Sequence, residues 1–314
     1  MIMLDCETYT NYFLVSMLDT TTNKTIDFEL YDNHPIDSKK LAAILRQHTT
    51  IGFNSSNYDL PVIVAALRGD TNAQIKQLSD DIINAPKVWP VLKKHKINIP
   101  QGFDHIDIIE LPIGQASLKI YGGRLHAPKL QDLPIEPSAI ITPEQRETLR
   151  LYCHNDLQVT RILYEELKPQ IALREQMSKQ YGIDLRSNSD AQIAENIIKH
   201  ELEAKNIDCT RPTVKIGTKY KYTTPKHITF KSPLFNDLVA MIERTDFVVN
   251  DNGQVALPDE LLTKISFDGA EYQLGIGGIH SCESSQAVIA QDDECLFDID
   301  VASYYPYLII DGQY

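Results

Sequence analysis

Three strand-like segments follow one another at the start of the chain, and their order limits the possible folds more than any other feature. Residues 2–4 form a short apolar run, residues 12–18 form a second, and residues 25–31 alternate apolar and polar positions. The polar segment 19–24 has the composition of a hairpin turn. Helical patterns then interleave with further short strands. The sequence therefore predicts an α/β domain with a mixed sheet over about residues 1–175.

The last element of that domain is predicted to be a long helix. Thr142 is placed to cap it, Pro143 suits its first turn, and Gln145 stands three residues after the cap. We expect the helix to end before Pro169, which lacks the N–H group that a helix interior needs. Asp156 lies on the apolar stripe of this helix, where an unpaired carboxylate is costly. A hydrogen-bonded core aspartate and a functional aspartate both remain open at this point.

Composition narrows the classes of function. The chain has 314 residues, with 43 Asp and Glu against 30 Lys and Arg, and a net charge of −13. This charge argues against binding nucleic acid through bulk positive potential, but not against binding phosphate through metal ions. No uncharged apolar run approaches the roughly 18 residues of a membrane helix, so we expect no membrane partner. The five cysteines lack CxxC spacing. They predict reduced thiols in a cytoplasmic protein, with neither a disulfide framework nor a zinc site.

Several carboxylates stand where a structural role does not easily explain them. Asp5 and Glu7 follow the first apolar strand and point to the same face at a period of two, so they repel each other unless a divalent cation lies between them. A solvated edge strand is the alternative. Asp59 either caps the helix that follows it or serves the same site. Tyr152 lies one turn before Asp156. Together these groups are the ones that two-metal phosphodiester hydrolysis requires.

Three short segments resemble the exonuclease motifs of family B DNA polymerases, and of the phage enzymes in particular. They are DCE at residues 5–7, NSSNYD at 54–59 and YCHND at 152–156. The resemblance implies a ribonuclease H-like 3′→5′ exonuclease domain, in which Tyr152 positions the attacking water. It also implies two Mg²⁺ or Mn²⁺ ions, held by Asp5, Glu7, Asp59 and Asp156.

A further segment resembles a motif that contacts the single-stranded primer end in protein-primed phage polymerases. It reads SLKIY at residues 117–121. The DNA contacts that the resemblance implies are made by Asn54, Asn57, Ser117, Leu118 and Lys119.

Residues 300–306, DVASYYP, resemble the DxxSLYP motif of the polymerase palm. In that motif the aspartate, here Asp300, binds a catalytic metal. The tyrosine before proline, here Tyr305, is the steric gate against ribonucleotides. Ser303 is the serine of the motif. The resemblance therefore implies the beginning of a palm domain in this part of the chain.

The remainder is predicted to be a connecting helical region over residues 176–270 and an incomplete palm over 271–314. Residues 211–236 contain five lysines interleaved with aromatic residues and no acidic residue. This stretch predicts either a strand laid along DNA or a solvated hairpin. Within the palm segment, residues 288–290 and 295–301 are expected to be strands.

The resemblance implies the N-terminal part of a DNA-directed DNA polymerase. Its expected activity is the removal of nucleotides from a single-stranded 3′ end or a frayed primer–template. Only eight residues follow Pro306, so polymerase activity is expected to be absent unless the remaining segments are supplied. The alternative is a non-catalytic half of a split polymerase that docks with a separately encoded partner. Either protein would be cytoplasmic, in a bacterial host cell or encoded by a virus.

Overall fold

The chain divides into two compact units, Met1–Cys209 and Thr210–Tyr314. The computed structural model describes residues 1–210, 213–226, 228–285 and 287–312. The predicted domain boundaries near residues 175 and 270 remain predictions.

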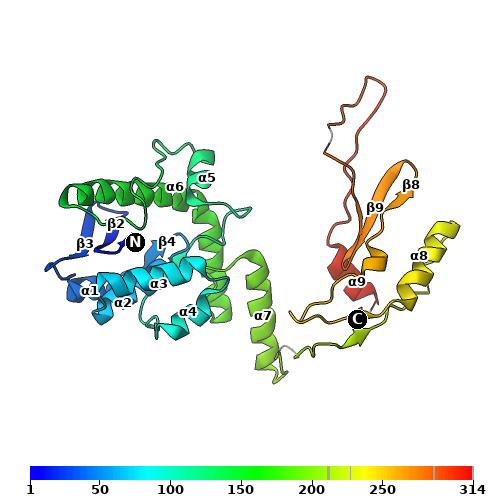
Figure 1. Cartoon of the computed structure of the whole chain (residues 1–314), viewed down its shortest axis with the longest axis horizontal. Coiled ribbons are helices and arrows are strands. Elements are labelled where there is room, and N and C mark those ends of the chain that lie inside the picture. The colour runs from blue at the N-terminus through cyan, green and yellow to red at the C-terminus, as the bar shows by residue number, and fades with distance from the viewer. Residues whose placement is uncertain (211–212, 227, 286, 313–314) are drawn as a thin grey trace. The chain divides into compact units, whose positions relative to one another are not determined.

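The first unit is an α/β domain built on a mixed five-stranded sheet (Figure 1). Its strands are β1 (Ile2–Tyr9), β2 (Tyr12–Asp19), β3 (Thr25–Tyr31), β4 (Thr50–Gly52) and β5 (His105–Asp107). Its helices are α1 (Ser38–Gln47), α2 (Asp59–Arg68), α3 (Asn72–Asn84), α4 (Val88–Lys94), α5 (Leu118–Arg124), α6 (Pro143–Tyr181) and α7 (Asp190–Ala204). The predicted α/β class and the mixed sheet are confirmed.

The strand order β3-β2-β1-β4-β5 places β1 at the centre of the sheet. β1 runs antiparallel to β2 along its whole length, from the pair Ile2–Asp19 to the pair Tyr9–Tyr12. It runs parallel to β4 only at Ile2 and Met3. The carboxyl half of β1, beyond Met3, is therefore not paired with β4. Ligands in open α/β sheets bind at such carboxyl ends.

Helices cover both faces of the sheet, with α6 on one side and α1, α2 and α3 on the other (Figure 1). On β1, Leu4 and Cys6 belong to the core that contains α1–α3, whereas Met3 belongs to the core that contains α6. Successive side chains of a strand point to opposite faces. Asp5 and Glu7 therefore face α6 together, as their spacing predicted.

The start of α6 is confirmed, and its predicted end is wrong. Thr142 caps the helix by accepting a hydrogen bond from the backbone N–H of Gln145. The helix continues through Pro169 to Tyr181, because Pro169 is exposed while Ile171 in the next turn is buried against the core. Burial of that face outweighs the one backbone hydrogen bond that proline removes.

The described residues of the second unit form short strands and two α-helices. Its elements are β6 (Lys219–Tyr220), α8 (Pro233–Arg244), β7 (Phe247–Val248), η1 (Asp259–Leu261), β8 (Ile265–Phe267), β9 (Ala270–Gly275), β10 (Gly278–Ser281) and α9 (Tyr304–Gly312). The strands expected at 288–290 and 295–301 are wrong, since both segments lack regular structure. Phe297 and Ile299 are 81% and 87% exposed. Alternating apolar side chains form a strand only where a neighbouring strand pairs with them.

Candidate metal centre

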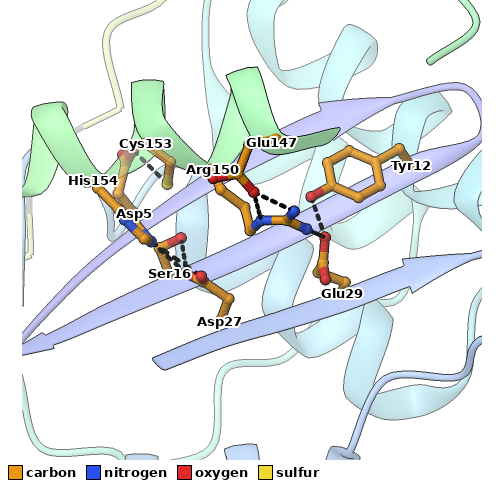
Figure 2. A network of polar contacts seen from close by, with 9 residues as sticks. All are labelled: Asp5, Tyr12, Ser16, Asp27, Glu29, Glu147, Arg150, Cys153 and His154. Carbon is orange, nitrogen blue, oxygen red and sulfur yellow. Dashed lines mark hydrogen bonds and ion pairs between the residues drawn. The ribbon is translucent and has the colours of Figure 1, made fainter. Parts of the chain in front are cut away.

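The two carboxylates of β1 meet the middle of α6. The Cys153 thiol donates a hydrogen bond to Asp5 Oδ2 across 3.2 Å (Figure 2). One potential ligand atom from each of Asp5, Glu7 and Cys153 lies within 4.8 Å of the other two. Cys153 and Glu7 are buried, and Asp5 is partly buried. This group could hold a metal ion. The sequence did not identify Cys153 as a possible ligand, because cysteine spacing alone gave no sign of a site.

The acidic groups raise one another's pKa. Burial raises the pKa of Asp5 to about 7, and the charge of Asp156 adds to this effect. Burial raises the pKa of Glu7 well above its usual range, with further contributions from Asp5, Asp156 and Asp59. Like charges held together in a buried site are costly unless a cation neutralises them.

Asp59 belongs with Asp5, Glu7 and Asp156 to one set of interacting carboxylates, called the acidic group below. Burial raises its pKa well above the usual range, and the charge of Asp5 is the next cause. Asp59 is 4% exposed, and its Oδ1 atom has no hydrogen-bond partner. It does not cap α2, because the N-cap is Tyr58 and no side chain caps that helix. The capping alternative for Asp59 is therefore wrong.

Tyr152 and Asp156 approach the acidic group from α6. Burial raises the pKa of Asp156, whereas the neighbouring Tyr152 and the positive charge of Lys119 oppose this shift. Burial and the charges of Asp156 and Glu7 raise the pKa of Tyr152, so its hydroxyl stays protonated at neutral pH. The structure thus brings the predicted catalytic residues of β1, α2 and α6 within electrostatic reach of one another.

The segment between β4 and α2 is held by an aspartate that the sequence did not single out. Asp107, at the end of β5, accepts hydrogen bonds from the backbone N–H groups of Asn54 and Ser56, each at 2.8 Å. It is 3% exposed. Asn54 has a positive φ of 58°, a conformation that asparagine tolerates better than most residues. Asp107 therefore fixes the turn that carries Asp59. Its position within the strand-like segment 104–109 was the one available signal.

A second buried contact supports the same turn. His105 bridges Thr50 and Ser55, with its Nδ1 2.8 Å from Thr50 Oγ1 and its Nε2 2.7 Å from Ser55 Oγ. Burial and the charge of Arg186 lower the pKa of His105 to about 4, so the ring is neutral at pH 7. A Cβ atom on Gly52 would collide with the Ser55 side chain. The close approach of β4 to this turn thus requires glycine.

Most of the residues predicted to contact DNA have structural partners. Asn57 Nδ2 donates to Asn54 Oδ1 at 3.2 Å. The Ser117 hydroxyl caps α5, and Leu118 packs against the core on the α6 side. Lys119 pairs with the fully exposed Asp132 at 3.1 Å. The positive charge of Lys119 acts on the acidic group by lowering the pKa of Asp156.

Polar contacts fasten α6 to the outer strands (Figure 2). Arg150 pairs with Glu29 of β3 at 2.8 Å, and the Tyr12 hydroxyl donates to the same carboxylate at 2.6 Å. One turn later, His154 lies 2.8 Å from Asp27 of β3. These contacts stand on either side of Tyr152 and Cys153 in the sequence. They fix the part of α6 that faces Asp5.

The palm-like residues lie in the second unit. Asp300 is exposed and precedes α9, and the carbonyl of Ser303 accepts a hydrogen bond from the N–H of Tyr307. Tyr305 lies in α9 and is 68% exposed. In the lysine-rich stretch, Lys219 and Lys221 both pair with Asp246. Arg211, Pro212 and His227 of that stretch lie outside the described residues.

Comparison with protein-family models and with curated proteins finds no match to this chain. Among the described residues, none of the helices combines the length and the apolar composition that crossing a bilayer demands. The chemistry of the acidic group is therefore the basis for assigning a function.

Proposed function

We propose that the first unit is a metal-dependent 3′→5′ DNA exonuclease with a ribonuclease H-like fold, and that the chain is part of a family B DNA polymerase. One observation carries this proposal. Asp5 and Glu7 of β1 place ligand atoms within 4.8 Å of each other and of Cys153 on α6, and the charges of Asp156 and Asp59 raise the pKa of Glu7. The sequence motifs provide separate support.

The donor set fits divalent cations. The unpartnered Oδ1 of Asp59 and the crowded carboxylates of Asp5 and Glu7 are oxygen ligands of the kind that Mg²⁺ and Mn²⁺ prefer. Asp5, Glu7, Asp59 and Asp156 would hold two such ions. When bound, two ions of this kind supply an activated water and stabilise the leaving oxygen in phosphodiester hydrolysis.

The protein's own groups orient the substrate. The protonated Tyr152 hydroxyl can donate a hydrogen bond to the attacking water beside Asp156. Lys119 supplies positive charge next to Asp156 for the phosphate backbone. Asn54, Asn57 and the α5 start at Ser117 and Leu118 would hold the 3′ end of the strand. In the second unit, Asp300, Ser303 and Tyr305 would belong to the polymerase palm.

The test is an exonuclease assay on the purified chain. A single-stranded oligonucleotide labelled at its 5′ end should shorten from the 3′ end in Mg²⁺ or Mn²⁺ and should stay intact in EDTA. The double change Asp5→Ala and Glu7→Ala should lower the rate at least about 100-fold, because even outer-shell metal partners are worth 10–100-fold. Glu165→Ala, which removes a half-exposed carboxylate of the same helix, is the matched control. Activity that survives the double change would contradict the site assignment.

A second candidate is docking with a separately encoded part of a polymerase. The observation that favours it is the exposure of Phe297, Ile299 and Ile310 in the second unit, which leaves large apolar side chains in water. Analytical ultracentrifugation distinguishes the two candidates. Self-association that Phe297→Asp abolishes supports docking, whereas a monomer with strong nuclease activity supports a self-sufficient exonuclease.

A further inference from the structure

Cys153 adds sulfur to a centre otherwise made of oxygen ligands. It is fully buried, and its thiol already contacts Asp5 Oδ2. Its Sγ lies within 4.8 Å of ligand oxygens of both Asp5 and Glu7. Zn²⁺ binds sulfur at about 2.3 Å and carboxylate oxygen at about 2.0–2.2 Å, so two ligand atoms on one ion lie roughly 3–4 Å apart. Modest side-chain rotations would bring all three atoms to one ion.

A second, independent observation points to a cation here. Asp59 is 96% buried, since its exposed fraction is 4%, and its Oδ1 has no hydrogen-bond donor. The charge of Asp5 raises the pKa of Asp59, and the charge of Asp59 raises that of Glu7, so the Asp59 carboxylate belongs to the same group. Buried polar atoms are almost always partnered in folded proteins. A carboxylate oxygen left without a donor in an acidic group is suited to a cation.

We propose that Asp5, Glu7 and Cys153 bind one thiophilic divalent cation, of the Zn²⁺ and Cd²⁺ class, which inhibits the exonuclease by displacing Mg²⁺ or Mn²⁺. On binding, the S–H bond of Cys153 breaks, an S–metal bond forms, and the proton passes to solvent without any change of oxidation state. Thiolate sulfur selects such cations, whereas Mg²⁺ is bound by oxygen. The inhibition rests on the proposed function, but the binding does not.

The binding test uses the full chain with Cys209, Cys282 and Cys295 replaced by Ser, because these three thiols are exposed or partly exposed. Cd²⁺ is titrated in, the cadmium–thiolate charge-transfer band is followed in the ultraviolet, and the bound ion is counted by equilibrium dialysis. We expect one Cd²⁺ per chain. Cys153→Ser should lose the band and bind Cd²⁺ at least about tenfold more weakly. Glu165→Ala, which removes a half-exposed carboxylate elsewhere in α6, is the matched control and should bind Cd²⁺ as the parent does.

A band that persists in Cys153→Ser, or disappears in Glu165→Ala, overturns the proposal. If circular dichroism shows that Cys153→Ser does not fold, Glu7→Gln with Cys153 intact takes its place. Cd²⁺ binding at least about tenfold weaker in Glu7→Gln supports the site. Unchanged binding overturns it.

The activity measurement separates the two proposals. Cd²⁺ should inhibit Mg²⁺-dependent nucleotide release, and Cys153→Ser should need at least about tenfold more Cd²⁺ for the same inhibition. A chain without Mg²⁺- or Mn²⁺-dependent activity overturns the proposed function alone, because the band and the stoichiometry are measured without DNA. A chain that is active but binds no Cd²⁺ overturns this inference alone.

Discussion

At the level of single residues, Asp5 is where burial and charge conflict most directly. Its carboxyl pKa is raised from 3.8 to about 7, first by burial and then by the charge of Asp156. The folded chain therefore binds this proton more tightly than the unfolded chain does. The contribution of Asp5 to the free energy of unfolding falls as the pH rises from about 4 to about 7, and stays low above that range.

We expect Asp5→Asn to stabilise the chain in EDTA at pH 8, because the amide removes one of the repelling charges. A gain of about 1–2 kcal/mol is typical when a strained functional group is neutralised. It corresponds to a rise in Tm of roughly 2–8 °C for a unit of this size. Calorimetry at pH 5 and pH 8 measures the effect, which should shrink at pH 5. Asp132→Asn, at a fully exposed carboxylate, is the control. A lower Tm for Asp5→Asn at pH 8 would contradict the account.

At the level of elements, the pair Arg150–Glu29 fastens α6 to β3. Its side chains are 28% and 16% exposed, so the pair is less hydrated than a surface ion pair. A double-mutant cycle with Arg150→Met and Glu29→Gln should give a coupling energy of about 1 kcal/mol. Glutamine keeps an acceptor for the Tyr12 hydroxyl, which isolates the ionic contribution.

The pair Lys168–Glu165 on the same helix is the control for this cycle. Its side chains are 52% and 48% exposed, so its coupling energy should be below about 0.5 kcal/mol. Urea unfolding of the single and double variants gives both values. Equal coupling energies in the two pairs would show that the contact to β3 adds nothing.

Pro169 is a second element-scale feature with a measurable effect. It lies inside α6 at an exposed position, where it removes one backbone hydrogen bond. Pro169→Ala should therefore raise the free energy of unfolding by about 1–3 kcal/mol in urea titrations. Pro143→Ala is the matched control, because proline suits the first turn and its replacement should give no gain. A destabilised Pro169→Ala would mean that the proline is needed for the shape of α6.

At the scale of the whole molecule, the proposed exonuclease site and its supporting cores lie within the first unit. Among the described residues, the three buried apolar clusters contain no residue that follows Ile171 in the sequence. We expect a fragment of residues 1–209 to unfold in one cooperative transition. Mn²⁺ at about 100 times its Kd should add about 2.7 kcal/mol to its stability, as in the full chain. Calorimetry with and without Mn²⁺ checks both points, and loss of the cooperative transition would contradict them.

The features of this molecule that its sequence predicts are those that depend on local patterns. The facing pair Asp5 and Glu7 follows from the two-residue period of a strand, and the start of α6 follows from Thr142 and Gln145. The role of Asp107 depends on backbone N–H groups 53 and 51 residues away. The place of Cys153 depends on where α6 crosses β1. Contacts of this kind are set by tertiary packing, which no local pattern contains.

The distance along the chain between Asp5 and Cys153 has a consequence for synthesis. The two residues are 148 positions apart. At roughly 5–20 residues per second, a ribosome takes about 7–30 s to make the intervening chain. During that interval β1, β2 and β3 can already have formed a hairpin sheet, with the acidic side of β1 still in water. The carboxylates are therefore hydrated when they first fold, and they lose water only when α6 is complete.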